Sequence, residues 1–334
     1  MLALWLAVSA GCVPPPEVAP PGSPQAQAPG PESVASGDAA DGYVEPLPPL
    51  PPEGYFLEEL AEGVYFFSTG FYNTLFVVAE GGVILADPIR GAGRKLRQAL
   101  KRVTDQPVKF LVYTHAYLDH IGDAHLFADT AQIIAHEQAR RLLKRYQDGL
   151  RPPPQIAFRR NYTLEFGGRR VELIYPGAGH GGGNVMVYLP REKVLMFTGV
   201  GGPRTLPGWG FESVDLYGQV LGLQQAVKLD FRVWVPGRGP RTGTPQELKQ
   251  LLQYYYDSRQ ADEVALREIR FQEAVAGSPS RDPQALLGRY QQRVADLCVR
   301  RLEPRYKPLM MGFETYARSH CTAWTQFHLT QKSP

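Results

Sequence analysis

Short runs of β-branched and aromatic residues alternate with amphipathic stretches from about residue 55 onward. Glycine, proline and charged residues bound these runs, which is typical of strands. In the first half the predicted strands are Gly63–Ser68, Asn73–Ala79, Val83–Ala86, Val108–Thr114 and Gln132–Ala135. In the second half they are Tyr162–Phe166, Val171–Tyr175, Asn184–Leu189, Val194–Phe197 and Arg232–Val235.

Apolar residues three or four positions apart predict helices between these strands. The predicted helices are Arg90–Val103, Asp123–Thr130, His136–Gln147 and Val214–Lys228. Two β-rich halves that each carry helices predict the α/β class, and specifically an αββα sandwich. We expect this domain to span residues 55–244, followed by a C-terminal helical extension over residues 245–334.

The first 54 residues follow a different pattern. Met1–Ala10 has the length of the apolar region of a signal peptide, and small residues precede Cys12. Residues 1–12 therefore resemble the lipobox of bacterial lipoproteins, which implies lipidation of Cys12. Residues 13–54 hold 13 of the 30 prolines and predict a disordered tether.

This N-terminal pattern predicts an exported protein of the bacterial cell envelope. The resemblance implies an outer-membrane lipoprotein, facing the periplasm or the exterior, that contacts the membrane through its lipid anchor. The alternatives are an ordinary cleaved signal peptide or a wrongly assigned start, with Cys12 as a free thiol. No uninterrupted apolar run is long enough to predict a membrane-spanning helix.

Composition narrows the possible partners. The 334-residue chain is 43% hydrophobic, which is enough for a buried core, and its formal net charge is +3. No Lys or Arg precedes Arg90, so the remainder carries a formal charge of +14. A basic surface of this kind attracts small anions, but no nucleic-acid-binding motif accompanies it.

If the domain is exported, Cys298 and Cys321 can form a disulfide worth about 3 kcal/mol, although the sequence does not establish the pair.

Histidines gather in two loops that follow predicted strands. Thr114–His120 comes directly after a buried strand and contains His115, Tyr117, Asp119 and His120. Residues 177–184 form a glycine-rich loop around His180. Imidazole and carboxylate groups that converge at strand ends are typical ligands of a divalent metal ion.

These motifs, in this order, resemble the metallo-β-lactamase superfamily over roughly residues 60–240. Thr114–His120 corresponds to the family's His-x-His-x-Asp-His, and His180 to its next ligand histidine. Asp87 corresponds to the aspartate that ends the opening strands, where it more plausibly fixes the loop of His115 than reacts. Phe197–Val200 corresponds to Phe-Thr-Gly-Asp, and Val235–Pro240 to Pro-Gly-His-Gly-Pro. The resemblance implies a metal-dependent hydrolase with zinc as its cofactor.

Three positions depart from the family pattern. Tyr117, Val200 and Arg238 stand where the resemblance places the second histidine, the metal-bridging aspartate and the last histidine. The resemblance leaves four metal ligands, His115, Asp119, His120 and His180, which would hold one zinc ion at most. A guanidinium at position 238 would repel a dication and would instead pair with Asp119 or with an anionic ligand.

Two functions follow from this pattern. In the first, the protein hydrolyses an ester, amide, thioester or phosphoester through metal-activated water. Asp119 would be the general base, Arg238 would stabilise the oxyanion, and Tyr117 would donate to a substrate oxygen or line the pocket. In the second, the protein is catalytically inactive and binds an anionic ligand or partner through Arg238 without metal, its histidines being remnants of an ancestral site. The expected ligand is a small, anionic molecule, and β-lactams have no particular support.

Overall fold

The computed structural model describes residues 42–331, which belong to one compact unit. The signal-like residues 1–12, with Cys12, and most of the predicted tether lie outside the described residues. The lipid anchor therefore stays a prediction.

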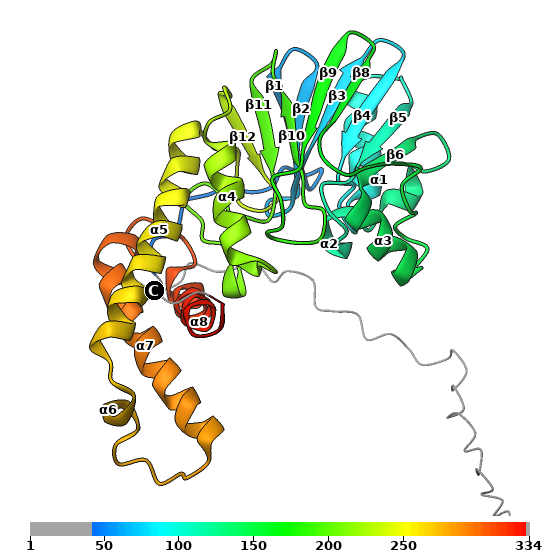
Figure 1. The fold of residues 1–334 in the computed structure, drawn as a ribbon. Helices are drawn as coiled ribbons and strands as arrows, with labels where there is room; N and C mark the ends of the chain where they lie inside the picture. Colours follow the sequence, from blue (N-terminus) through cyan, green and yellow to red (C-terminus); the bar gives the residue numbers. More distant parts are fainter. Residues whose placement is uncertain (1–41, 332–334) are drawn as a thin grey trace, which may run out of the picture. The chain divides into compact units, whose positions relative to one another are not determined.

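The described strands form two sheets (Figure 1). The first has the order β1 (Phe56–Ala61), β2 (Val64–Ser68), β3 (Asn73–Ala79), β4 (Gly82–Ala86), β5 (Val108–Val112), β6 (Gln132–His136), β7 (Ile156–Phe158). The second has the order β12 (Val233–Pro236), β11 (Val194–Phe197), β10 (Met186–Leu189), β9 (Arg169–Ile174), β8 (Tyr162–Phe166). Neighbouring strands from β1 through β4, and from β8 through β11, pair antiparallel. Neighbouring strands from β4 through β7, and the pair β11 and β12, are parallel.

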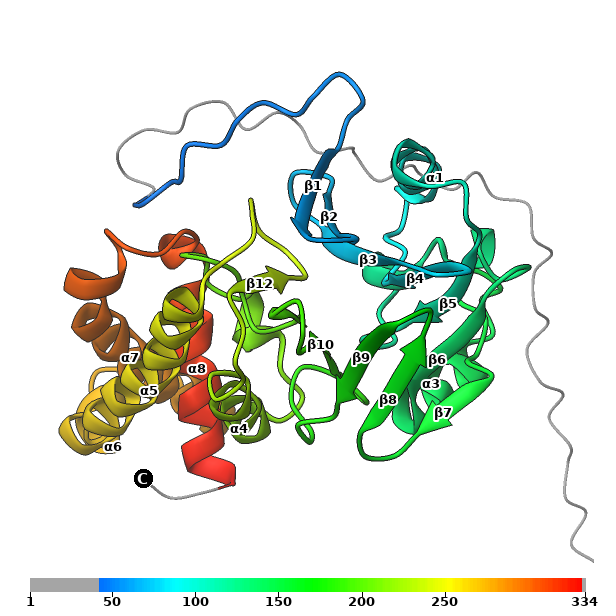
Figure 2. The same ribbon diagram turned by 90° about the horizontal axis from the view of Figure 1, so that it is seen from above.

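Helices cover the outer faces of both sheets (Figure 2). On the side of the first sheet lie α1 (Gly93–Val103) and α3 (Glu137–Tyr146). The short α2 (Leu118–Ile121) and the 3-10 turn η2 (Ala124–Leu126) come between β5 and β6 in the chain. On the side of the second sheet lie η3 (Trp209–Glu212), α4 (Leu216–Ala226), α5 (Pro245–Glu268), α6 (Phe271–Val275), α7 (Pro283–Tyr306) and α8 (Phe313–Thr330).

Three apolar clusters correspond to the three interfaces of a four-layer sandwich. One lies between the sheets and includes Val77 and Val187, one lies under α1 and α3, and the largest lies between the second sheet and the helices from α4 to α8. The predicted αββα sandwich with a C-terminal helical extension is confirmed.

The sequence misjudged several local elements. The helix predicted over Asp123–Thr130 is wrong. Only the 3-10 turn η2 forms there, with bonds from Leu126 N to Asp123 O and from Phe127 N to Ala124 O. Bonds that reach back three residues close a tighter turn than an α-helix and seldom continue far. Strands β1 and β7 were not predicted: no residue of β1 is fully buried, and β7 is three residues long.

The C-terminal helices are joined by a covalent link. Cys298 of α7 and Cys321 of α8 form a buried disulfide with a Cα–Cα distance of 5.9 Å. The pair that the sequence left open is therefore present. Within residues 42–331, none of the helices has both the length and the apolar character needed to cross a lipid bilayer.

Candidate functional site

The predicted site residues come together at one edge of the sandwich. His115 and Tyr117 follow β5, Asp119 and His120 belong to α2, and Arg238 follows β12. Backbone bonds from Asn73 N to Gly237 O (3.0 Å) and from Gly239 N to Phe71 O (2.9 Å) tie the loop of Arg238 to the β2–β3 hairpin. Parallel strands end at a common edge, so side chains that are distant in sequence meet there.

Two imidazoles lie beside that of His115. Its ring centroid lies 4.8 Å from that of His120 and 5.1 Å from that of His180. All three rings are buried, and each has one nitrogen without a hydrogen-bond partner: Nε2 of His115, Nδ1 of His120 and Nε2 of His180. Buried polar atoms are rarely left unpartnered, so these three indicate a place for water, an ion or a ligand.

Neighbouring groups fix the tautomers of two of these rings. Thr114 donates its hydroxyl to Asp87 (2.5 Å), so its oxygen accepts the Nδ1–H of His115 at 2.7 Å. His180 donates Nδ1–H to the backbone carbonyl of Glu212 at 2.7 Å. A histidine that donates through Nδ1 presents an unprotonated Nε2, which is the orientation of a metal ligand or a base.

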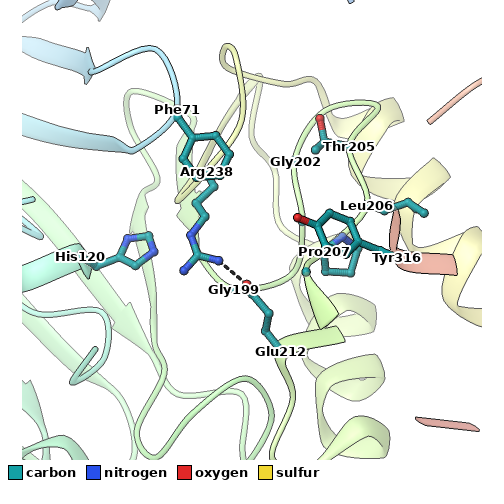
Figure 3. A pocket seen from close by; sticks show the side chains of 12 residues that line it. Phe71, His120, Gly199, Gly202, Thr205, Leu206, Pro207, Glu212, Arg238 and Tyr316 are labelled. Carbon is teal, nitrogen blue, oxygen red and sulfur yellow. Dashed lines mark hydrogen bonds and ion pairs between the residues drawn. The ribbon is translucent and has the colours of Figure 1, made fainter. Parts of the chain in front are cut away.

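Two carboxylates hold Arg238. Its Nη1 donates to Glu212 (Figure 3). Its Nη2 donates to Asp119 at 2.5 Å, and its guanidinium lies 5.5 Å from the ring centroid of Tyr72. The pairing of Arg238 with Asp119 that the sequence suggested is present. Glu212 adds a second carboxylate, which gives this group a net negative charge.

Burial controls the protonation of the site. Burial lowers the pKa of His115, of His120 and of His180, so all three imidazoles are neutral at neutral pH. Although burial raises the pKa of Asp119, His120 and Arg238 lower it by more, and Asp119 stays ionised. Desolvation raises the pKa of Asp87 to about 7.

Two substituted positions have a structural role. Tyr117 contacts the rings of His115 and His180, with centroids 4.9 and 4.8 Å away, and donates its hydroxyl to the backbone oxygen of His180 at 2.9 Å. Val200 is fully buried and packs in the apolar cluster on the helix side of the second sheet. An aspartate at that position would bring a carboxylate into apolar surroundings.

Two glycines leave space for the imidazoles. A Cβ atom at Gly199, whose φ is +77°, would come within 2.2 Å of the His180 ring. A Cβ atom at Gly237 would come within 2.9 Å of His120. The ends of β11 and β12 therefore approach the rings as bare backbone, which larger residues would prevent.

The donor set does not match a two-ion site. Among residues 42–331, no group of three or more His, Cys, Asp or Glu side chains is arranged to hold a metal ion. The ion pair with Arg238 engages the carboxylate of Asp119, and the side chain of Val200 has no atom that can bind a metal ion. The rings of His115 and His180, whose centroids lie 5.1 Å apart, nevertheless each carry an unpartnered Nε2 atom. Neutral imidazole is a good ligand of a transition-metal ion.

Glu212 was missed in the sequence. It lies in η3, where Gly210, Phe211 and Glu212 all have positive φ (57°, 61° and 50°). The glycines around Trp209 signal a turn, but no pattern shows that the turn aims a carboxylate at Arg238. Of the other histidines, His125 is exposed, whereas His136, His320 and His328 are buried.

Comparisons with known proteins agree with this geometry. The family model described as the Metallo-beta-lactamase superfamily matches residues 68–252, more than half of the 334-residue chain. A 2,4-dinitroanisole O-demethylase subunit alpha of Nocardioides sp. (strain JS1661) is 34% identical over 222 residues, covering 61% of this chain and 65% of that relative. A metallo-beta-lactamase type 2 of Elizabethkingia meningoseptica is 25% identical over 158 residues, covering 42% of this chain and 59% of that relative. The chain thus matches slightly less than two thirds of the length of either relative.

A solved structure supports the fold. The metallo-beta-lactamase from Pontibacter korlensis is 23% identical to this chain with a TM-score of 0.53, and the match covers 60% of this chain and 99% of that structure. At this identity the similarity concerns the fold alone. Together with the family match and the order of the motifs, it shows that the chain belongs to the metallo-β-lactamase superfamily.

Proposed function

We propose that this protein is a hydrolase that uses one divalent transition-metal ion, in place of the two for which its family pattern provides. The observation that carries the proposal is the pair of buried, unpartnered Nε2 atoms of His115 and His180, whose tautomers are fixed by Thr114 and by the carbonyl of Glu212. His120, with its own unpartnered nitrogen, is the nearest further imidazole.

The charge of the site supports a bound cation. Arg238 alone would repel a dication, but Asp119 and Glu212 outnumber it and the three imidazoles are neutral. The local field is therefore negative, and a cation beside His115 and His180 would be attracted rather than repelled. Zinc suits neutral imidazole ligands and is our first choice of ion.

Each residue has a defined part in the proposed reaction. When bound, the ion would supply Lewis acidity and lower the pKa of a water molecule to about 7. Asp119 is ionised and accepts a proton as general base, although its low pKa makes it a weak one. Arg238 lines the pocket and orients Asp119, but Glu212 and Asp119 already take its two terminal nitrogens, so we do not assign it the stabilisation of an oxyanion. The bond cleaved is an ester, amide, thioester or phosphoester.

Metal analysis tests this proposal directly. The full chain, purified after expression with zinc, should contain about one equivalent of transition metal by mass spectrometry. His115→Ala and His180→Ala should each lose most of it, whereas His125→Ala, an exposed histidine, should retain it. Less than about a tenth of an equivalent in the wild-type protein would contradict the proposal.

A second function is favoured by the missing third donor. No three His, Cys, Asp or Glu donors converge within residues 42–331, and we therefore propose as the alternative a catalytically inactive member that binds its ligand without metal. In that case the purified protein contains no metal, and His115→Ala leaves ligand binding intact.

We also propose that the protein is exported and anchored through Cys12. A buried disulfide between Cys298 and Cys321 supports an oxidising compartment, since cytosolic thiols are kept reduced. Incorporation of a labelled fatty acid, and its loss in Cys12→Ser, tests the anchor. Labelling that persists in Cys12→Ser would contradict it.

A further inference from the structure

The pocket next to Arg238 combines aromatic walls with a floor whose guanidinium is already paired. We infer that this pocket takes a small neutral molecule with an aromatic body, and that Glu212 is the residue that excludes anions. The inference rests on the proposed function only in that it places the substrate in the same pocket. The charge of the chain led us to expect an anionic ligand, and we now propose a neutral one in its place.

The walls come from three separate segments (Figure 3). Phe71, at the tip of the β2–β3 hairpin, is 54% exposed and lines one side. Leu206 and Pro207, after β11, and Tyr316 of α8 line the other side. Trp209 meets the Tyr316 ring edge-on with centroids 5.7 Å apart. Aromatic side chains bury a planar ring well, so these walls favour an aromatic ligand.

The size of the cavity limits what enters it. Its volume is about 80 Å³, which is small for a binding pocket. The reacting group of a substrate would fit inside, beside His120 and Arg238, while its ring lies against Phe71 and Tyr316 at the mouth. Large polycyclic ligands are therefore disfavoured.

The floor disfavours anions. Glu212 and Asp119 take both terminal nitrogens of Arg238, and the remaining Nε is buried without a partner. A carboxylate or phosphate would have to displace one of these side chains, or stay unpaired beside two negative charges. Like charge at a binding site is a common means of rejecting a wrong ligand.

The C-terminal extension holds Glu212 in place. Gly210 N donates to Ser319 Oγ at 3.0 Å, and His320 Nε2–H donates to Gly208 O at 2.9 Å. The ring of Phe211 stacks on His320 with centroids 4.0 Å apart. These contacts come from α8, which follows the matched family region 68–252, and they stabilise three successive residues with positive φ. We therefore assign α8 a role in substrate specificity.

Benzamide and benzoate provide a matched pair of probes, because they have the same ring and nearly the same shape but differ in charge. Their affinities for the full chain can be measured by ligand-observed NMR titration. We expect the wild-type protein to bind benzamide at least about tenfold more tightly than benzoate. Phe71→Ala and Tyr316→Ala should each weaken benzamide binding several-fold, whereas Phe271→Ala, an exposed phenylalanine of α6, should not.

Variants of Glu212 test the role of its charge. Glu212→Gln removes one of the two negative charges beside Arg238 and should reduce the preference for benzamide to about twofold or less, by strengthening benzoate binding. Glu212→Asp keeps the charge and should keep the preference. Thermal unfolding of each variant shows whether the fold is retained.

Three results would overturn the inference. They are equal or tighter binding of benzoate by the wild-type protein after dialysis against a chelator, no measurable binding of benzamide at tens of millimolar, and an unchanged preference in Glu212→Gln. The titrations are made on the protein as purified and again after dialysis against a chelator. Benzoate binding that disappears with the metal reports the metal, so a failure of the one-ion hydrolase proposal is distinguishable from a failure of this inference.

Discussion

The two halves of the site have diverged in different ways. In the half formed by His115 and His180, two imidazoles remain, and each has a buried Nε2 atom without a hydrogen-bond partner. In the half formed by Asp119 and Arg238, a guanidinium lies between two carboxylates. A covalently attached cation can balance carboxylates as a metal ion does, but it has no vacant coordination position. One half therefore holds the imidazoles to which we assign the proposed metal ion, and the other is an ion-pair cluster.

Removing Arg238, the cation of the second half, should have the largest effect on the difference between the two halves. Arg238→Ala leaves Asp119 and Glu212 facing each other without a partner in a partly buried place. We expect the free energy of unfolding to fall by about 4 kcal/mol, because breaking such a pair strands its charges. Denaturant unfolding measures this loss.

A surface pair provides the control for Arg238. Arg170 pairs with Glu165 and Glu172 on the solvent side of the second sheet. Arg170→Ala should cost less than about 1 kcal/mol, since exposed ion pairs contribute little. Equal losses in the two variants would show that Arg238 is no more than a surface ion pair.

The support of Glu212 by α8 predicts a pH dependence of stability. Burial lowers the pKa of His320 to about 4, whereas an unfolded histidine has a pKa near 6.5. The unfolded state therefore binds the proton first as the pH falls. The contribution of His320 is fully present above pH 6.5 and is lost between about pH 6.5 and 4, by about 3 kcal/mol in total.

His320→Gln isolates this contribution. Its stability should fall less steeply than that of the wild-type protein over the same pH range, as measured by denaturant unfolding at each pH. His125→Gln, an exposed histidine, should leave the wild-type slope unchanged. Parallel curves for the wild-type protein and His320→Gln would contradict the assignment.

Sequence patterns predicted the elements that depend on local composition. Asn73–Ala79 was predicted with its actual bounds because a continuous apolar run makes a buried strand. His115, His120 and His180 were found because the order of family motifs places them at strand ends. Glu212 was not, because its direction depends on a turn that α8 stabilises from more than a hundred residues away. Long-range support of this kind has no local signature.

Adding a metal ligand to the half formed by His115 and His180 should increase the difference in metal affinity between the two halves. Tyr117 already contacts both His115 and His180, so Tyr117→His places a further imidazole, in addition to that of His120, beside them. We expect zinc affinity to rise by about thirtyfold, which corresponds to about 2 kcal/mol, as measured by competition with a chromogenic chelator. Arg238→His should not have this effect, because Val200 supplies no carboxylate on that side. Similar gains in both variants would mean that the halves have not diverged.

The smallest expected effect concerns Thr114, whose hydroxyl is hydrogen-bonded to the ring of His115. Thr114 accepts Nδ1–H of His115 and donates to Asp87, so Thr114→Val removes both bonds while keeping the shape of the side chain. Loss of the bond that orients a ligand imidazole typically lowers metal affinity about tenfold, or by about 1.4 kcal/mol. Thr114→Ser keeps the hydroxyl and should retain zinc affinity. If Thr114→Val bound zinc as the wild-type protein does, the free nitrogen of His115 would not depend on Thr114, and the first half would be less organised than its hydrogen bonds indicate.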